Sequence, residues 1–189
     1  FTQSGGTLFG TGTLTVTGPT TWTGGYETGP GTTVLQGITT LGDANSSFYY
    51  SNVYLDGGRT LTLEGSATGV GYGLQIFLNG GLLPGSGTLR IASGATFDDQ
   101  TAQGLSVATL NYGGADTGAD AIVVNDGTFK KTGPATTSTI SASFDNSGTV
   151  DVQSGTLSLN GGGTDVGAVY QGTGTIQFSG DTRTLDVAS

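Results

Sequence analysis

Apolar and polar residues alternate with a period of two in short runs along the whole chain, and glycine-bearing turns separate the runs. The recurring phrase is a turn, Thr, an apolar residue, any residue and a second apolar residue. It occurs as GTGTLTVTG (10–18), GSGTLRIASG (85–94), SGTVDVQSG (147–155), SGTLSLNG (154–161) and GTGTIQFSG (172–180). This alternation predicts short strands with one apolar face each, and no window has the sustained 3.6-residue spacing of a helix.

The phrases recur at intervals that suggest a coil. Equivalent threonines such as Thr39 and Thr60, or Thr60 and Thr88, lie roughly 20 to 28 residues apart, the length of one coil of a parallel β-helix. One such unit cannot bury its apolar face alone, whereas stacked units bury a continuous thin core. We therefore predict an all-β fold, a right-handed parallel β-helix (β-solenoid) of roughly eight coils, forming a single domain over residues 1–189. The expected inward residues are Leu14, Val16, Leu61, Leu63, Leu89, Ile91, Val150, Val152, Leu157, Leu159, Ile176 and Phe178.

Composition and charge exclude several classes of protein. Of 189 residues, 37 are Gly and only 10% are charged, yet Val, Ile, Leu and Phe recur throughout, which argues against disorder of the whole chain. The net charge is -9, and the five cations are scattered without a basic stripe, so no nucleic-acid partner is expected. Cys and His are absent, which removes disulfides, thiolate metal sites and histidine bases. No apolar run approaches the roughly 20 residues of a membrane-spanning helix, so no membrane insertion is expected.

Longer stretches resemble a family of surface proteins. GTLTVTGPTTWTGG (12–25), LDGGRTLTLEGSAT (55–68) and GTFKKTGPATTSTISASFDNSGTVDVQSGTLSLNGGGT (127–164) are similar to repeat arrays of large secreted bacterial β-helix proteins, the filamentous-haemagglutinin-like and autotransporter-like adhesins. The resemblance covers most of the chain and is most specific at 127–164. It implies a right-handed parallel β-helix exported to the cell surface, with a binding or structural role and no catalytic residues to transfer. Because the chain opens on Phe1, we expect either a processed chain or a fragment of a longer protein.

Both ends of the chain read as strands rather than caps, as FTQSGGTLF (1–9) and TRTLDVAS (182–189). An open end of a β-helix presents unpaired backbone donors and acceptors, which form a docking surface. We predict a head-to-tail contact between copies, in which Phe1, Leu8 and Phe9 at one end cover Leu185 and Val187 at the other. Such a heterologous contact does not close on itself and propagates into a fibre.

Aromatic residues concentrate in the first half of the chain. They are Trp22, Tyr26, Phe48, Tyr49, Tyr50, Tyr54, Tyr72 and Phe77. Most are expected to stack in a ladder inside the solenoid, but Phe48, Tyr49 and Tyr50 are consecutive, so a strand there must expose at least one of them. Exposed aromatic rings stack on sugars or anchor protein interfaces. We predict a lateral or ligand contact at Phe48, Tyr49, Tyr50 and Tyr54.

Three further chemistries have candidate residues. Asp98 and Asp99 are the only adjacent acidic pair; neighbours in a strand point to opposite faces, and a turn is the simpler interpretation. Calcium ligands could come from the aspartates at 116, 120 and 126, or from Asp165, but the nonapeptide calcium-binding pattern is matched at best once. An ice-binding face would need Thr-x-Thr at one fixed position on successive coils of equal length, and the unequal spacings argue against it. We expect no metal, no cofactor and no catalytic residues.

The expected function is that of a non-enzymatic, extracellular structural protein. It would be a secreted subunit or repeat of a bacterial surface fibre or adhesin, with copies of itself as partners and surface glycans as a further partner. Two alternatives are a carbohydrate-binding module and a β-helix enzyme that processes polysaccharides.

Overall fold

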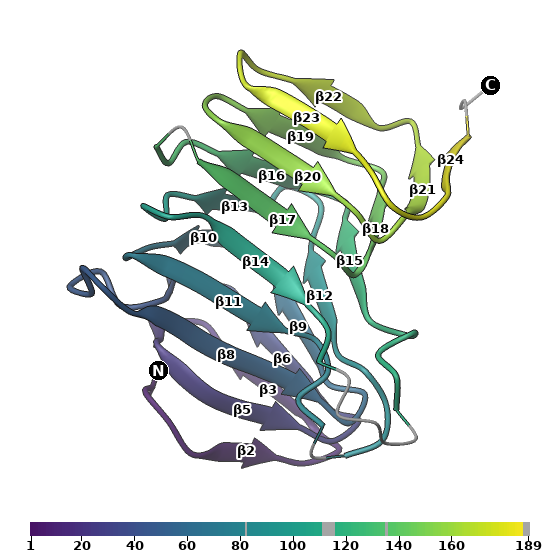
Figure 1. Ribbon diagram of the computed structural model, residues 1–189. Coiled ribbons are helices and arrows are strands. Elements are labelled where there is room, and N and C mark those ends of the chain that lie inside the picture. The colour runs from purple at the N-terminus through teal and green to yellow at the C-terminus, as the bar shows by residue number, and fades with distance from the viewer. Residues whose placement is uncertain (82, 111–115, 135, 187–189) are drawn as a thin grey trace.

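The computed structural model describes residues 1–81, 83–110, 116–134 and 136–186 as strands joined by turns (Figure 1). Twenty-four strands form three sheets of eight parallel strands each. Consecutive strands belong to different sheets, so three strands and three corners make one coil. Eight coils follow one another from the N-terminal coil, purple in Figure 1, to the C-terminal coil, yellow. The fold is the predicted right-handed parallel β-helix.

Each sheet takes every third strand. Sheet A contains β1 (Thr2–Gln3), β4 (Thr20–Trp22), β7 (Thr39–Leu41), β10 (Ser66–Gly69), β13 (Thr96–Asp99), β16 (Thr128–Lys131), β19 (Thr149–Val152) and β22 (Val169–Gln171). Sheet B contains β2 (Thr7–Phe9), β5 (Gly24–Thr28), β8 (Tyr50–Asp56), β11 (Gly73–Phe77), β14 (Leu105–Ala108), β17 (Thr137–Ile140), β20 (Thr156–Leu159) and β23 (Thr175–Phe178). Sheet C contains β3 (Thr13–Val16), β6 (Thr32–Leu35), β9 (Thr60–Leu63), β12 (Thr88–Ile91), β15 (Ile122–Asn125), β18 (Ser143–Asn146), β21 (Gly163–Val166) and β24 (Arg183–Asp186). Over the part of the chain that the structure describes, no helix has the length and apolar character needed to cross a membrane.

The strands stay in register although the coils differ in length. In sheet C, Thr13, Thr32, Thr60 and Thr88 form one continuous column. The intervals along it are 19, 28 and 28 residues, and the next one, from Thr88 to Ile122, is 34. Unequal coil lengths therefore do not prevent a single column of threonines, although the Thr-x-Thr pattern that an ice-binding face would need is not repeated on successive coils. The neighbouring outward column is mixed, because it holds Thr15, Val34, Thr62 and Arg90.

The corners absorb the differences in coil length. The corner from sheet C to sheet A contains two to four residues in every coil. Insertions occur at the other two corners. Residues 42–49 lie between β7 and β8, residues 78–87 between β11 and β12, and residues 109–121 between β14 and β15. The insertions therefore change the lateral surface of the rod, whereas the three strands of each coil keep their pairing with the neighbouring coils.

The core runs along the axis of the rod and is built from the predicted inward positions. Leu61, Leu63, Leu89, Ile91, Val150, Val152, Leu157 and Leu159 are all buried, as expected. Leu14, Val16 and Ile176 are only half-buried, and Phe178 is 51% exposed. These four belong to the first and last described coils, each of which has a neighbouring described coil on one side only. Pattern alone thus predicted their direction, but not the extent of their burial.

Candidate functional site

The N-terminal coil leaves one edge of each sheet unpaired. β1, β2 and β3 each pair on one side only, and the side chains of Leu8, Leu14 and Val16 are half-buried. A hollow of about 430 Å³ opens on this end and is lined by residues 1–8. Phe1, which is 43% exposed, lines the hollow together with Leu8, whereas Phe9 alternates with Leu8 and points to the outer flank, 68% exposed. Of the three contact residues predicted for this end, Phe1 and Leu8 therefore lie on the end surface and Phe9 does not.

The C-terminal coil leaves the opposite edges unpaired. β22, β23 and β24 each have one neighbouring strand. Leu185 occupies an inward position above Asp165, but it is 70% exposed because β24 is the outermost described strand of its sheet. Phe178 is exposed in the same way. The fifth predicted contact residue, Val187, lies outside the described residues.

An arginine partly closes this C-terminal end. Arg183 stands in register with Gly163, and the missing side chain of Gly163 lets the guanidinium reach the carbonyl oxygen of Phe144 at 2.8 Å. Arg183 also donates to both carboxylate oxygens of Asp165, at 2.7 and 2.6 Å. Tyr170 donates its hydroxyl hydrogen to Asp165 at 2.8 Å, and burial raises the pKa of this phenol to about 12. The polar ends of these side chains are therefore satisfied within the protein.

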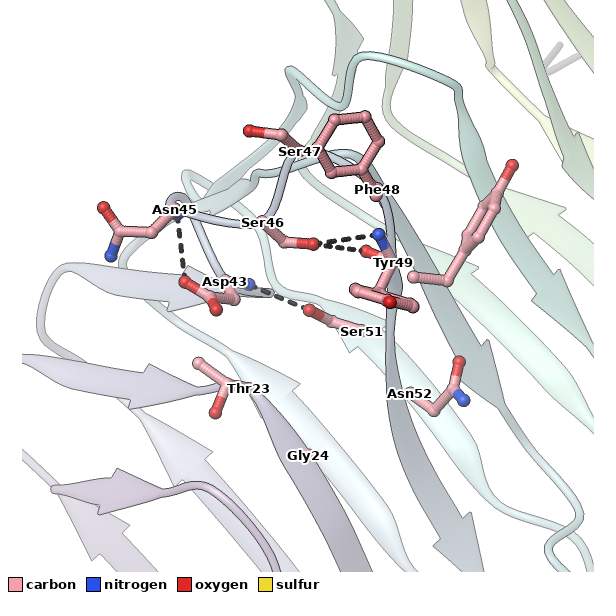
Figure 2. Close-up of a pocket in the computed structure, with 11 residues that line it drawn as sticks. Thr23, Gly24, Asp43, Asn45, Ser46, Ser47, Phe48, Tyr49, Ser51 and Asn52 are labelled. Atoms are coloured by element: carbon pink, nitrogen blue, oxygen red, sulfur yellow. Dashed lines mark hydrogen bonds between the residues drawn. The ribbon is translucent and has the colours of Figure 1, made fainter.

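The second candidate site is the corner loop 42–49 with the start of β8 (Figure 2). It encloses an open pocket of about 600 Å³, lined by Thr23, Gly24, Asp43 and residues 45–52. Phe48 is 79% exposed, Tyr49 80% and Tyr50 43%. The structure thus brings three of the four residues predicted for a lateral or ligand contact to one pocket.

Hydrogen bonds within the loop hold this pocket open. The amide of Asn45 donates to Oδ1 of Asp43, and the amide of Asp43 donates to Oγ of Ser51, both at 2.9 Å. Ser46 bridges the loop, because its hydroxyl donates to the carbonyl oxygen of Tyr49 at 2.7 Å and accepts from the Tyr49 amide at 3.1 Å. These four hydrogen bonds fix the conformation of the loop.

The fourth predicted residue, Tyr54, belongs to a separate aromatic stack. Tyr26, Tyr54 and Phe77 are in register on sheet B, with ring centroids 4.2 and 5.0 Å apart and nearly parallel planes. They alternate with buried residues such as Val53 and therefore lie on the outer face of the sheet. The expected internal ladder is wrong for these three residues, since parallel strands align side chains equally well on both faces. Of the aromatic residues in the predicted ladder, only Trp22 is buried in the core.

Sequence reasoning missed a set of buried charges. Three of the five cations lie inside the rod, each bound to an acidic residue of the preceding coil. The pairs are Glu27–Arg59 at 3.4 Å, Asp99–Lys131 at 3.7 Å and Asp165–Arg183 at 2.6 Å. The available signal was their separation of 32, 32 and 18 residues, close to one coil. The other two cations lie outside: Arg90 pairs with Asp126, and Lys130 stands between Asp98 and Asp151 in register.

Asp99 is the most fully satisfied of the buried acids. Thr101 donates its hydroxyl hydrogen to Oδ1 at 2.6 Å, and Ser138 donates to Oδ2 at 2.5 Å. Ser138 in turn accepts a hydrogen bond from the amide of Leu105 at 3.1 Å. Both Asp99 and Lys131 have side chains with 0% exposure. A buried charge needs such partners, because its hydration is lost on folding.

The burial of Glu27 predicts that the stability of the protein depends on pH. Burial raises its pKa above the usual 4.5, although hydrogen bonds from Thr33 and the charge of Arg59 act in the opposite direction. The folded state therefore holds this proton more tightly than the unfolded state, so the contribution of Glu27 is full below about pH 4.5 and declines as pH rises through the folded-state pKa. We expect the unfolding free energy of the wild type to fall relative to the Glu27→Gln variant between pH 4 and 7. Urea denaturation across this range checks the sign, and a constant difference contradicts it.

The carboxylates considered for catalysis or calcium do not converge. Asp98 and Asp99 lie in β13 rather than in a turn, with Asp99 buried and Asp98 accepting hydrogen bonds from Thr132 on the outer face. Asp126 is paired with Arg90, and Asp116 accepts hydrogen bonds from Gly118 and Ser86. Within the described ranges no three acidic side chains form a group that could hold a metal ion.

Comparison of the chain with family models, with curated proteins and with solved structures gives no match. The assignment of a function therefore depends on the geometry of the end coils, the loop pocket and the buried charges.

Proposed function

We propose that the chain is a non-enzymatic structural unit of an extracellular bacterial surface fibre or adhesin, assembled by head-to-tail stacking of copies. The observation that supports this proposal is the pair of open sheet edges at the first and last described coils. Inward apolar side chains that neighbouring coils cover elsewhere are half-buried at one end and exposed at the other. Backbone groups of three edge strands accompany them at each end, and a further coil would pair both sets.

The two ends also have complementary shapes in the same columns of the core. The inward column that ends in Phe178 begins at Gly25 in the second coil, and it passes through Val53, Ile76, Val107, Ile140 and Leu159. Gly5 and Gly6 line the hollow on the N-terminal end beside this column. A second copy stacked in register would place its Phe178 ring over residues without side chains. In sheet C, the inward column that begins at Val16 ends at Leu185, so Leu185 of one copy would cover Val16 of the next.

The buried charges support a structural role over a catalytic one. Three acidic side chains are committed to cations inside the rod, and their carboxylates receive two or more polar contacts each. A polysaccharide-processing enzyme needs carboxylates that converge on a substrate groove. The extracellular location is supported by the resemblance to secreted surface arrays.

The Leu185→Asp variant is expected to stay folded and to lose end-to-end assembly. Stacking would bury the new carboxylate against apolar side chains without a partner, which costs more than the contact supplies. Electron microscopy and sedimentation of the wild type should show filaments with an axial repeat of about 40 Å, from eight coils spaced about 4.8 Å apart.

Ile38→Asp is the matched control. Ile38 is 71% exposed, as Leu185 is 70% exposed, but it lies on the flank of the rod just before β7. Its replacement should leave filaments intact. A wild-type chain that remains monomeric at high concentration, or Leu185→Asp filaments of normal length, would show that the proposed stacking does not occur.

A further inference from the structure

Phe48 and Tyr49 are the most exposed large hydrophobic side chains in the part of the chain that the structure describes. Other outward aromatic residues cover one another: Tyr26, Tyr54 and Phe77 are stacked, and Tyr50 meets Tyr72 edge-on with centroids 5.5 Å apart. Among the described residues, Phe48 and Tyr49 have no such ring partner. Their exposure is maintained by a loop that its own hydrogen bonds hold in place, so the rings are presented to an external partner.

The polar lining of the pocket has unused hydrogen-bonding capacity. Asp43 uses Oδ1 to accept from Asn45, which leaves Oδ2 for an external donor. Oδ1 of Asn52, at the base of the pocket, is shielded from solvent and has no hydrogen-bond partner among the described residues. The side chains of Asn45 and Ser47 are exposed at the rim. The groups accessible to a ligand are therefore those of Asp43, Asn45 and Ser47, which supply both acceptors and donors for hydroxyl groups.

The charge of the pocket lining limits the classes of ligand that the pocket can bind. Asp43 is the only charged residue in the lining, and the chain carries a net charge of -9. Anionic ligands are therefore repelled, and a single carboxylate is too few ligands for a divalent cation. Flat aromatic faces next to carboxylate, amide and hydroxyl groups fit a compound that combines apolar C–H faces with many hydroxyl groups.

We propose that this pocket binds a neutral saccharide. Phe48 and Tyr49 pack against the C–H faces of the sugar rings, while Asp43 and the exposed side chains of Asn45 and Ser47 form hydrogen bonds with sugar hydroxyls. The bound length exceeds one ring, because the site continues along β8. Tyr50 and Asn52 both lie on the outer face of that strand, whereas the ring of Tyr54 is covered by Tyr26 and Phe77, so the continuation ends before Tyr54. Gln75 stands in register with Asn52 and adds a second amide to the same surface.

The test uses the Leu185→Asp protein, so that assembly and saccharide binding are measured separately. Calorimetric titration with neutral hexasaccharides (cello-, xylo-, manno-, malto- and chito-oligosaccharides) and with oligogalacturonate gives the specificity. We expect at least one neutral hexasaccharide to bind, more tightly than its disaccharide, and the acidic one not to bind. Tyr49→Ala and Phe48→Ala should each weaken binding about tenfold, equivalent to about 1.4 kcal/mol.

Two matched variants test whether the aromatic faces of Phe48 and Tyr49 themselves contribute to saccharide binding. Tyr49→Phe keeps the aromatic face and should retain most of the affinity. Phe9→Ala removes an aromatic side chain that is 68% exposed at a different place and should leave binding unchanged. The proposal is overturned if no neutral saccharide binds at millimolar concentration, if only the acidic one binds, or if both alanine variants bind as well as the parent. A protein ligand captured by this loop without saccharide binding would equally overturn it.

Discussion

The Lys131→Met variant is expected to lose about 3–5 kcal/mol of unfolding free energy, because it leaves a charged Asp99 buried without its cation. Met has nearly the volume of Lys, so packing changes little. Lys131 and Asp99 have completely buried side chains, and solvent cannot replace the missing charge. Urea denaturation followed by circular dichroism measures the loss.

Two further variants separate the charge from the side chain. Combining Lys131→Met with Asp99→Asn should recover much of the stability, since an amide can still accept from Thr101 and hydrogen-bond with Ser138. Lys130→Met changes the adjacent lysine, which faces outward between Asp98 and Asp151, and should cost at most about 1 kcal/mol. Equal losses for Lys131→Met and Lys130→Met would contradict a stabilising role for the buried pair.

Phe129→Ala is expected to cost about 3–5 kcal/mol through the cavity it leaves. The Phe129 ring lies between Phe97 and Phe144, with centroid distances of 5.5 and 6.1 Å, and all three are fully buried. Neighbouring coils are fixed by their hydrogen-bond ladders and cannot collapse into the space.

The control for Phe129→Ala is Phe48→Ala, which removes the same side chain from an exposed position. Its effect on thermal and urea stability should be within about 0.5 kcal/mol, as for other surface substitutions. A comparable loss of unfolding free energy in both variants would show that the buried aromatic cluster does not stabilise the core as expected.

The fold was predictable from sequence because a period of two is a local property. Alternation identified the direction of residues such as Leu61 and Val150 without knowledge of their neighbours in space. Strands that contain turn-forming residues were harder to detect. β5 includes Gly24 and Gly25, and β13 ends in two aspartates, so both segments resemble turns although tertiary pairing keeps them extended.

The candidate sites were predictable from sequence only where residues adjacent in the chain cannot all be buried. Three consecutive aromatic residues cannot all face inward, which identified Phe48 to Tyr50. Whether Tyr54 points inward or outward depends on the position of the strand relative to the core, and that depends on the length of the preceding corner. The buried ion pairs depend on register between coils of 19 to 34 residues, so an acid and a base far apart in sequence become neighbours only once the insertions are known.

The concentration of insertions at two corners has an evolutionary consequence. Lengthening a flexible loop costs only about 0.6 kcal/mol for each doubling of its length, so these corners can accept new segments while the ladders stay in place. Selection can then alter the flank, including the 42–49 loop, without changing the end coils. In a fibre built in this way, the lateral contacts could diversify between variants while the end-to-end contacts stay compatible with the ancestral chain.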